Sequence, residues 1–199
     1  MHAKALECAR QAFVVEAESL LAAGNWFDDG SFSRAVDVLV KAPRIAASGC
    51  GHSGIACQHF AHLMCCIERP ARFISPAEAV HGALGFLQSE DVMLLASRGG
   101  ETAELLPILD ICKKKGVTVI SVTGNLQSPL AKGADIVLPM QVGRETDTYN
   151  AQGTTSFTVL SVMFDALQAA LIEETGFRNE QFAQIHPGGA VGARLNGRS

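Results

Sequence analysis

The chain has 199 residues, of which 48% are hydrophobic and 18% are charged. This composition excludes a disordered chain, and the length allows one domain with a full hydrophobic core. The formal net charge is −4, and the chain contains a single Trp and a single Tyr. Because the sequence offers neither a basic stripe nor much aromatic stacking surface, we expect no nucleic-acid partner.

No run of apolar residues approaches the roughly 18–20 that a membrane span needs. The N-terminal segment MHAKALECARQ lacks the apolar stretch of a secretory signal. We therefore expect no membrane association and a cytoplasmic location. The six cysteines form no CxxC pair, so we expect reduced and mostly buried thiols rather than disulfides. A zinc site at Cys50 with nearby histidines is an alternative.

Apolar residues at helical spacing predict a helix over residues 2–23, which ends at Gly24, and a second helix after Asp29. The elements that follow are a strand at 44–48, a helix at 54–67, strands at 71–75 and 91–97, a helix at 102–115, a strand at 117–123, a short helix at 127–134, a strand at 135–139 and a helix at 154–175. Strands rich in Val, Ile and Leu that alternate with helices are typical of a parallel sheet covered on both faces.

This pattern predicts an α/β fold, a three-layer sandwich in which helices flank a five-stranded parallel sheet. We interpret the whole chain, 1–199, as a single domain in which residues 1–40 form N-terminal helices and 41–195 form the α/β core. Ligands of such sheets bind beyond the carboxyl ends of the strands. The loops expected on that rim are 49–54, 76–85, 97–102, 123–128 and 140–153.

The first of these loops, GCGHSG at 49–54, matches the G-x-G-x-x-G spacing of dinucleotide-binding folds. Its glycines allow a phosphate to approach the backbone at a helix N-terminus. A nicotinamide cofactor would also need an acidic residue at the end of the second strand, and neither Glu68 nor Glu78 is well placed for it. A lone phosphate bound by Gly51 and the Ser53 hydroxyl fits the loop better than a dinucleotide.

The second loop, at 97–102, also joins a strand to a helix and reads SRGGET. It offers the hydroxyls of Ser97 and Thr102, two glycines and the guanidinium of Arg98. Taken alone, the loop is equally well interpreted as an ordinary helix N-cap with acidic residues near the positive dipole end. Two such loops at one end of a sheet favour convergence on a shared anion, and a phosphate is the anion that fits.

The motifs GCGHSG and SRGGETAE resemble those of the SIS (sugar isomerase) domain family. The segments SPAEAVHGALG (75–85) and AQIHPGGAVGARL (183–195) are similar to stretches typical of its D-arabinose 5-phosphate isomerase branch. The resemblance implies a flavodoxin-like fold, a bound sugar phosphate, and homotetramers with sites between subunits. It also implies a phosphosugar isomerase that interconverts an aldose phosphate and a ketose phosphate. We expect the paired CBS domains that many relatives append to be absent, since the chain ends soon after the HPGG segment.

Aldose–ketose isomerisation moves a proton between adjacent carbons through an enediol, and it needs a base near neutral pH rather than a redox cofactor. We therefore expect neither a cofactor nor a metal. Histidines and desolvated carboxylates suit this chemistry. The residues that match catalytic positions of the branch are His52, His81, Glu101, Glu145 and His186. Each also has a structural alternative: Glu101 as a helix cap, Glu145 as solvated loop charge, and the histidines as turn residues.

Four departures from the branch pattern bear on activity and substrate. His52 stands where relatives carry Lys, Ala83 replaces an Asp, Gly99 replaces a Ser, and residues 150–153 lack the usual Pro. A neutral histidine stabilises developing enediolate charge differently from an ammonium group. These departures leave an alternative function open, that of a non-catalytic regulatory module that binds a sugar phosphate and reports to another protein.

Overall fold

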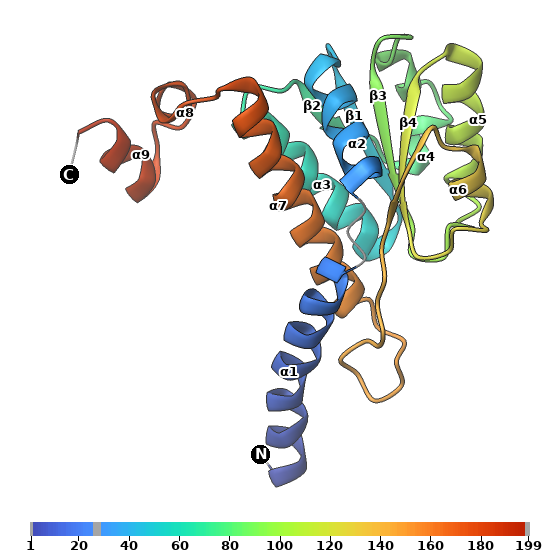
Figure 1. Cartoon of the computed structure of the whole chain (residues 1–199), viewed down its shortest axis with the longest axis vertical. Helices are drawn as coiled ribbons and strands as arrows, with labels where there is room; N and C mark the ends of the chain where they lie inside the picture. The colour runs from blue at the N-terminus through green and yellow to red at the C-terminus, as the bar shows by residue number, and fades with distance from the viewer. Residues whose placement is uncertain (1, 26–28, 198–199) are drawn as a thin grey trace.

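The computed structural model describes residues 2–25 and 29–197, and it has helices on both faces of one sheet (Figure 1). Its helices are α1 (Ala3–Asn25), α2 (Asp29–Lys41), α3 (Gly51–Cys66), α4 (Pro76–Ala79), the 3₁₀ turn η1 (Ala83–Phe86), α5 (Leu106–Lys115), α6 (Pro129–Gly133), α7 (Thr155–Thr175), α8 (Asn179–Ile185) and α9 (Gly189–Leu195). Its strands are β1 (Ile45–Gly49), β2 (Ala71–Phe73), β3 (Val92–Ala96), β4 (Thr118–Thr123) and β5 (Ile136–Pro139).

The five strands are all parallel and lie in the order β2-β1-β3-β4-β5. This is the flavodoxin-like, doubly wound order, in which the chain reverses direction across the sheet between β1 and β3. Ligands of such sheets bind at that switch point, beyond the carboxyl ends of the two strands. The predicted α/β fold with a five-stranded parallel sheet and a helical N-terminus is therefore confirmed.

Alternating strand residues divide the core into two layers. Ala47 and Leu94 belong to a cluster with α2, α3 and α7, whose centre includes Phe60 and Phe164 at a ring distance of 4.8 Å. Ala46 and its neighbours belong to the opposite cluster, with α5 and the α4–η1 segment. Because both faces are covered, the central strands are buried along their whole length.

Two helices, α3 and α5, begin several residues from their predicted starts. α3 begins at Gly51 rather than at 54, because the positive φ of Gly51 (+55°) turns the chain from β1 directly into the helix. α5 begins at Leu106 rather than at 102, and its Pro107 lies in the first helical turn, where a proline fits. The residues before it form a turn in which the Leu105 amide donates to the Thr102 carbonyl at 3.0 Å.

The switch-point loop depends on close packing between two glycines. A Cβ added to Gly54 would lie 2.6 Å from the carbonyl oxygen of Gly49. We expect Gly54→Ala to lower the free energy of unfolding by about 3 kcal/mol, because backbone atoms cannot yield as a side chain can. Urea denaturation measures the effect. The control is Gly85→Ala, where a Cβ meets nothing within 4 Å; a similar loss there would contradict the packing argument.

α7 is the one helix of the described residues that is long and apolar enough, by length and composition alone, to cross a membrane. The sequence was expected to contain no apolar stretch of this length. Core helices pass the same test, and α7 packs against α1, α2 and α3. Its buried residues include Phe164, Leu167 and Leu171.

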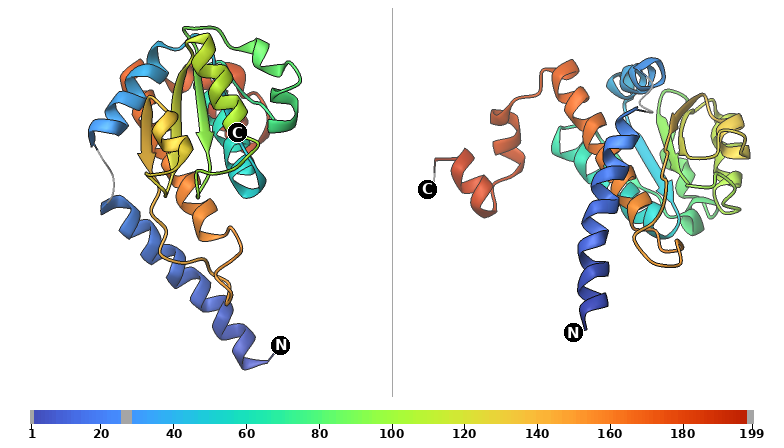
Figure 2. Two further views of the ribbon diagram at one scale, coloured as in Figure 1. Left: turned by 90° about the vertical axis from the view of Figure 1, so that its right-hand side faces the viewer. Right: turned by 60° about the horizontal axis from the view of Figure 1, so that its bottom comes forward.

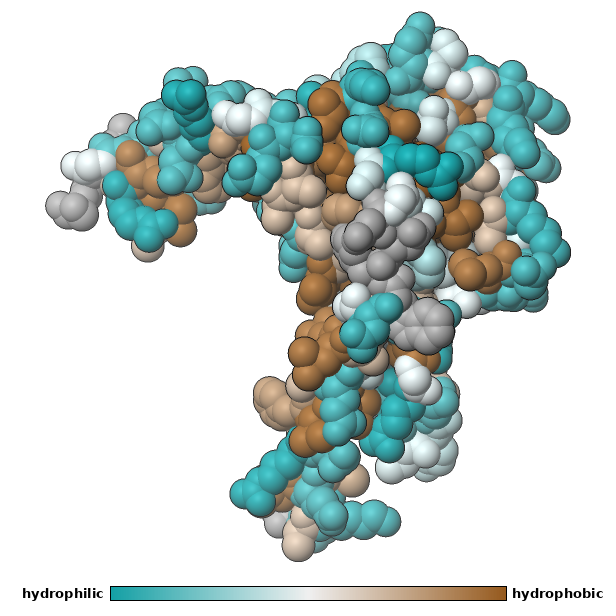
Figure 3. All heavy atoms as spheres, in the orientation of Figure 1, coloured by the Kyte–Doolittle hydropathy of each residue, from teal (hydrophilic) through white to brown (hydrophobic). Residues whose placement is uncertain are grey.

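Two parts of the chain extend away from the sheet. α1 projects beyond the edge where the segment before α7 lies, and α8 and α9 lie beyond the opposite end of α7 (Figures 1 and 2). A hydrogen bond of 2.9 Å from Gln181 of α8 to Glu68, which precedes β2, places α8 at the amino-terminal edge of the sheet. Apolar side chains are exposed along α1 (Figure 3), among them Phe13 and Leu21.

Candidate functional site

The two glycine-containing loops leave the same edge of the sheet from neighbouring strands. β1 and β3 are paired in register, with Gly49 opposite Ala96. The residues that follow these partners, 50–54 and 97–102, therefore lie next to each other at the switch point. This arrangement is the one that the sequence predicts for a shared anion site.

Hydroxyl and amide groups line this edge. The Ser97 and Thr102 hydroxyl oxygens are 2.7 Å apart, and the Gly100 amide donates to Ser97 Oγ at 3.0 Å. Ser53 lies in the first turn of α3, and its hydroxyl has no hydrogen-bond partner among the described residues. Cys50, the N-cap of α3, provides no side-chain cap, so the first amides of the helix are available to an anion. We call residues 51–53 and 97–102 the cradle.

The loop after β4 supports the second half of the cradle. The Gly124 amide donates to the Arg98 carbonyl at 3.0 Å, and the Thr123 hydroxyl donates to the same oxygen at 3.2 Å. The Leu130 amide donates to the Gly100 carbonyl at 3.2 Å. These bonds hold the backbone of the SRGGET loop in one conformation, which is what preorganised phosphate binding requires.

Glu145 is a buried carboxylate rather than solvated loop charge. Its side chain is 0% exposed, and Arg98 Nη1 lies 2.6 Å from its Oε1. The Thr154 hydroxyl and the Ser156 amide donate to its Oε2 at 3.2 and 3.1 Å. Glu145 thus occupies the N-terminus of α7, where a negative charge is favoured. Two predicted site residues, Arg98 and Glu145, are brought into contact across 47 positions of sequence.

The side chain of His52, a residue of the cradle, contacts the start of α7 and the loop before it. Its ring meets that of Phe157 edge-on, with centroids 6.2 Å apart. The ring also lies against Gly153, where an added Cβ would be 3.0 Å from His52 Nδ1. His52 is therefore held against the loop that enters α7.

The segment between Glu145 and α7 is organised by side chains that bind its own backbone. The Asn150 Oδ1 accepts the Glu145 amide at 2.7 Å, and Asn150 adopts a positive φ of +55°, a conformation that Asn tolerates well. Asp147 accepts from the amides of Tyr149, Ala151 and Gln152. The amide of Gln152, with those of the other two residues, lowers the pKa of Asp147 from its ordinary value of 3.8.

We expect Asp147→Asn to raise amide exchange over residues 148–152 by roughly tenfold, because one carboxylate oxygen is replaced by a donor that repels those amides. Since the folded pKa lies below 3.8, the bonds are present above pH 3.8 and are lost as pH falls through the lower value. Deuterium exchange followed by mass spectrometry at several pH values measures both effects. Equal protection in the variant and the unmodified protein would contradict the prediction.

Glu101 and Glu104 occupy different environments. Glu101 is exposed, and its Oε1 accepts from Asn125 Nδ2 at 3.4 Å. Burial, and then the charge of Glu104, raise the pKa of the Cys50 thiol, which places Glu104 near the first loop. The sequence predicted Glu101, but not Glu104, as a catalytic candidate. The place of Glu104 three residues later, before α5, is the signal that could have indicated a position near the first loop. No group of three or more metal-ligating side chains occurs among the described residues.

Two predicted catalytic histidines make no hydrogen bond or ring contact with the cradle among the described residues. His81 is exposed between α4 and η1, and the described residues include no side-chain partner for it. His186 ends α8, with its ring 4.8 Å from that of Phe182, at the far end of α7. The structure of one chain therefore brings together the predicted residues of the cradle with His52 and Glu145, but not His186.

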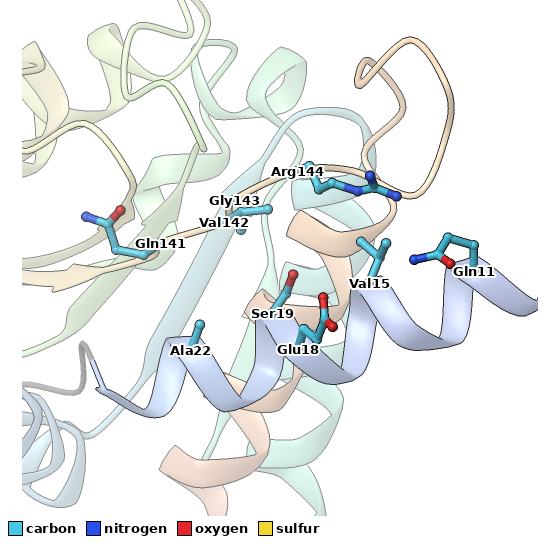
Figure 4. Close-up of a pocket in the computed structure, with 9 residues that line it drawn as sticks. All are labelled: Gln11, Val15, Glu18, Ser19, Ala22, Gln141, Val142, Gly143 and Arg144. Atoms are coloured by element: carbon cyan, nitrogen blue, oxygen red, sulfur yellow. The ribbon is translucent and has the colours of Figure 1, made fainter. Parts of the chain in front are cut away.

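A hollow of ≈ 470 Å³ lies between α1 and the segment that leads to Glu145 (Figure 4). It is lined by Gln11, Val15, Glu18, Ser19, Ala22, Gln141, Val142, Gly143 and Arg144. A second hollow of ≈ 350 Å³ shares Gln11 and Arg144 with it and reaches Glu145. The Glu145 segment thus lines a crevice along α1.

The profile of the SIS domain matches residues 38–170 of the chain. The chain belongs to the SIS domain family. The match covers α3, the sheet and most of α7, and it includes both cradle loops. α1, α8 and α9 lie outside the matched residues.

Curated relatives share much of the SIS domain sequence. The chain is 42% identical over 165 residues to the arabinose 5-phosphate isomerase KdsD of Pseudomonas aeruginosa, a match that covers 82% of this chain and 51% of the relative. It is 36% identical over 191 residues to the arabinose 5-phosphate isomerase GutQ of Salmonella typhimurium, which covers 96% of this chain and 59% of the relative. The chain therefore spans about half the length of these relatives.

Solved SIS structures of similar length superpose closely. One from Listeria monocytogenes gives a TM-score of 0.91 at 39% identity and covers 94% of this chain and 100% of its own. One from Escherichia coli CFT073, solved in complex with A5P, gives a TM-score of 0.87 at 30% identity and covers 94% of this chain and 100% of its own. These likenesses agree with the branch resemblance of the motifs.

Proposed function

We propose that this SIS domain is a phosphosugar isomerase that interconverts an aldose phosphate and a ketose phosphate through an enediol. The observation that carries the proposal is the position of a buried carboxylate, Glu145, beside a cradle of hydroxyls and helix N-terminal amides. The names of the curated relatives and the A5P-bound relative support arabinose 5-phosphate as the first substrate to test.

In this proposal the cradle binds the phosphate and leaves the sugar carbons over the Glu145 segment. The hydroxyls of Ser53, Ser97 and Thr102 and the amide of Gly51 hold the phosphate oxygens, since a phosphate is bound well by hydroxyls and by amides at a helix N-terminus. Arg98 adds a cation at the same loop.

The proton transfers require an acid–base group near the sugar carbons. We assign these transfers to Glu145, which pairs with Arg98 of the cradle, and to His52 of the cradle itself. Glu101 stands at the outer rim, where it can orient the open sugar chain through its charge and through Asn125. A histidine tuned near neutral pH can shuttle protons between the two sugar oxygens.

We further propose that His81 and His186 act in the site of a neighbouring copy, within a homotetramer located in the cytoplasm. The position of α8 at the amino-terminal edge of the sheet prevents His186 from reaching the cradle of its own chain. The exposed apolar residues of α1, among them Phe13 and Leu21, support burial against another copy.

A panel of pentose and hexose phosphates, including D-arabinose 5-phosphate, tests the activity. The expected result is conversion of one aldose phosphate to its ketose, detected by NMR of the equilibrated mixture. No conversion across the panel, together with tight binding of an unchanged ligand, would instead identify the regulatory module that the departures at His52, Ala83 and Gly99 leave as an alternative.

We expect Thr102→Val to weaken phosphosugar binding by about 1.5–3 kcal/mol, because a hydrogen bond to a charged phosphate is lost while the side-chain volume is kept. Isothermal titration calorimetry measures the change in Kd. Thr118→Val, at the opposite end of β4, is the matched control and should leave the Kd unchanged. If Thr102→Val and the unmodified protein bind the phosphosugar with equal affinity, the Thr102 hydroxyl does not bind the phosphate.

A further inference from the structure

We propose that Arg98 is a positioning residue through which the substrate phosphate releases Glu145. The inference rests on the proposed function, because it requires a phosphate in the cradle and a base at Glu145. With an empty cradle, Arg98 holds the carboxylate in place. A bound dianion recruits the guanidinium and leaves the carboxylate free to turn toward the sugar.

The geometry places Arg98 between two anionic partners. Its backbone belongs to the cradle loop and is fixed there by the bonds from Gly124 and Thr123. Its side chain reaches away from the loop, with Nη1 2.6 Å from Glu145 Oε1. Because these bonds hold the backbone of Arg98, an exchange of partners would involve rotation of its side chain rather than movement of the loop.

The charges favour the exchange when a phosphate arrives. The Arg98 side chain is 41% exposed and uses one of its five N–H donors on Glu145, so the guanidinium is accessible and retains free donors. A phosphate dianion carries more charge than a carboxylate and accepts two parallel N–H bonds in the fork geometry. A half-exposed cation therefore gains more from the dianion than from Glu145.

The contacts of the Glu145 carboxylate change once Arg98 has moved to the phosphate. In the empty state, three groups hold the carboxylate, namely Arg98, Thr154 and Ser156. Without Arg98, two neutral donors remain, both at Oε2, and Oε1 has no other partner among the described residues. A carboxylate that is no longer paired with its cation can turn toward the sugar and accept a proton from it. The ion pair between Arg98 and Glu145 thus keeps the base from acting on sugars that carry no phosphate.

Deuterium exchange with inorganic phosphate as the probe tests the release directly. Phosphate should protect the amides of 97–102, and it should raise exchange of the Ser156 amide about tenfold, since the loss of one charged bond weakens the hold on Glu145. In Arg98→Gln the Ser156 amide should exchange rapidly from the start and should not respond to phosphate. The control is Arg144→Gln, which removes the same charge from an exposed arginine next to Glu145 in the sequence. Its Ser156 amide should respond to phosphate as that of the unmodified protein does.

Kinetics provide a second readout that a merely structural role would not produce. Arg98→Gln should raise the KM for the phosphosugar at least tenfold with little change in kcat, and it should raise turnover of the unphosphorylated sugar about tenfold. Arg98→Lys, which keeps the charge without the fork, should restore part of the phosphate response. A fall in kcat as large as that of Glu145→Gln would overturn the inference.

The two proposals fail in different ways. Protection of 97–102 by phosphate without any change at Ser156, or an unaltered response in Arg98→Gln, overturns the role of Arg98 and leaves the isomerase proposal standing. If phosphate does not protect the amides of 97–102, the cradle does not bind phosphate, and both proposals are wrong. The phosphate titration needs only the unmodified protein, so the test stands even if Arg98→Gln does not fold.

Discussion

Glu145→Gln is expected to lower kcat for the phosphosugar by about 10²–10⁴-fold while leaving binding nearly intact, because a neutral amide cannot remove the proton that isomerisation transfers. Gln is of equal size, and its carbonyl oxygen can still accept from Ser156 at the N-terminus of α7. The substitution also frees Arg98 for the phosphate, so the Kd should not rise. Steady-state kinetics and calorimetry with the same phosphosugar separate the two effects.

The control for this variant is Glu174→Gln, an exposed carboxylate at the far end of α7. It makes the same chemical change without contact to the site and should retain full activity. Thermal unfolding of both variants shows whether the buried position tolerates the amide. A comparable loss of binding and of turnover in Glu145→Gln would identify Glu145 as a structural cap of α7 rather than as the base.

His186→Ala is expected to reduce turnover by about 10²–10⁴-fold without a change in phosphate binding. The second part of the prediction concerns mixed assemblies. When Glu145→Gln and His186→Ala chains are unfolded together in equal amounts and refolded, activity should return to about a quarter of that of the unmodified protein, because random assortment joins an intact Glu145 of one chain to an intact His186 of another.

The mixing experiment depends on where α8 lies. If His186 served its own chain, each mixed site would still lack one of the two groups, and no activity would return. Each variant refolded alone is the control, because it shows whether refolding without the other variant restores activity. The buried Nδ1 of His186 has no partner among the described residues, and its ring contacts Phe182, so thermal unfolding of His186→Ala must accompany the kinetics.

Local sequence patterns were sufficient to predict the sheet and the two loops of the cradle. Strands of buried aliphatic residues separated by helical periods predict parallel pairing, because a crossover helix returns the chain to the same edge. Gly51 and Gly54 indicated the tight turn from β1 into α3, since conformations and contacts that exclude a Cβ require glycine. The start of α5 was predicted four residues early because Thr102 resembles an N-cap, whereas Pro107 marks the first turn.

The sequence by itself determined the fold class, the edge of the sheet at which the proposed cradle lies and the hydroxyl groups available there, because these follow from periodicity and from residues adjacent in the chain. Only the tertiary structure decided that Arg98 pairs with Glu145, that His52 lies against Gly153, and that His186 lies remote from its own cradle. Each of these relations joins residues from elements far apart in sequence. Their distances depend on how helices pack across the sheet, and no local pattern encodes that packing.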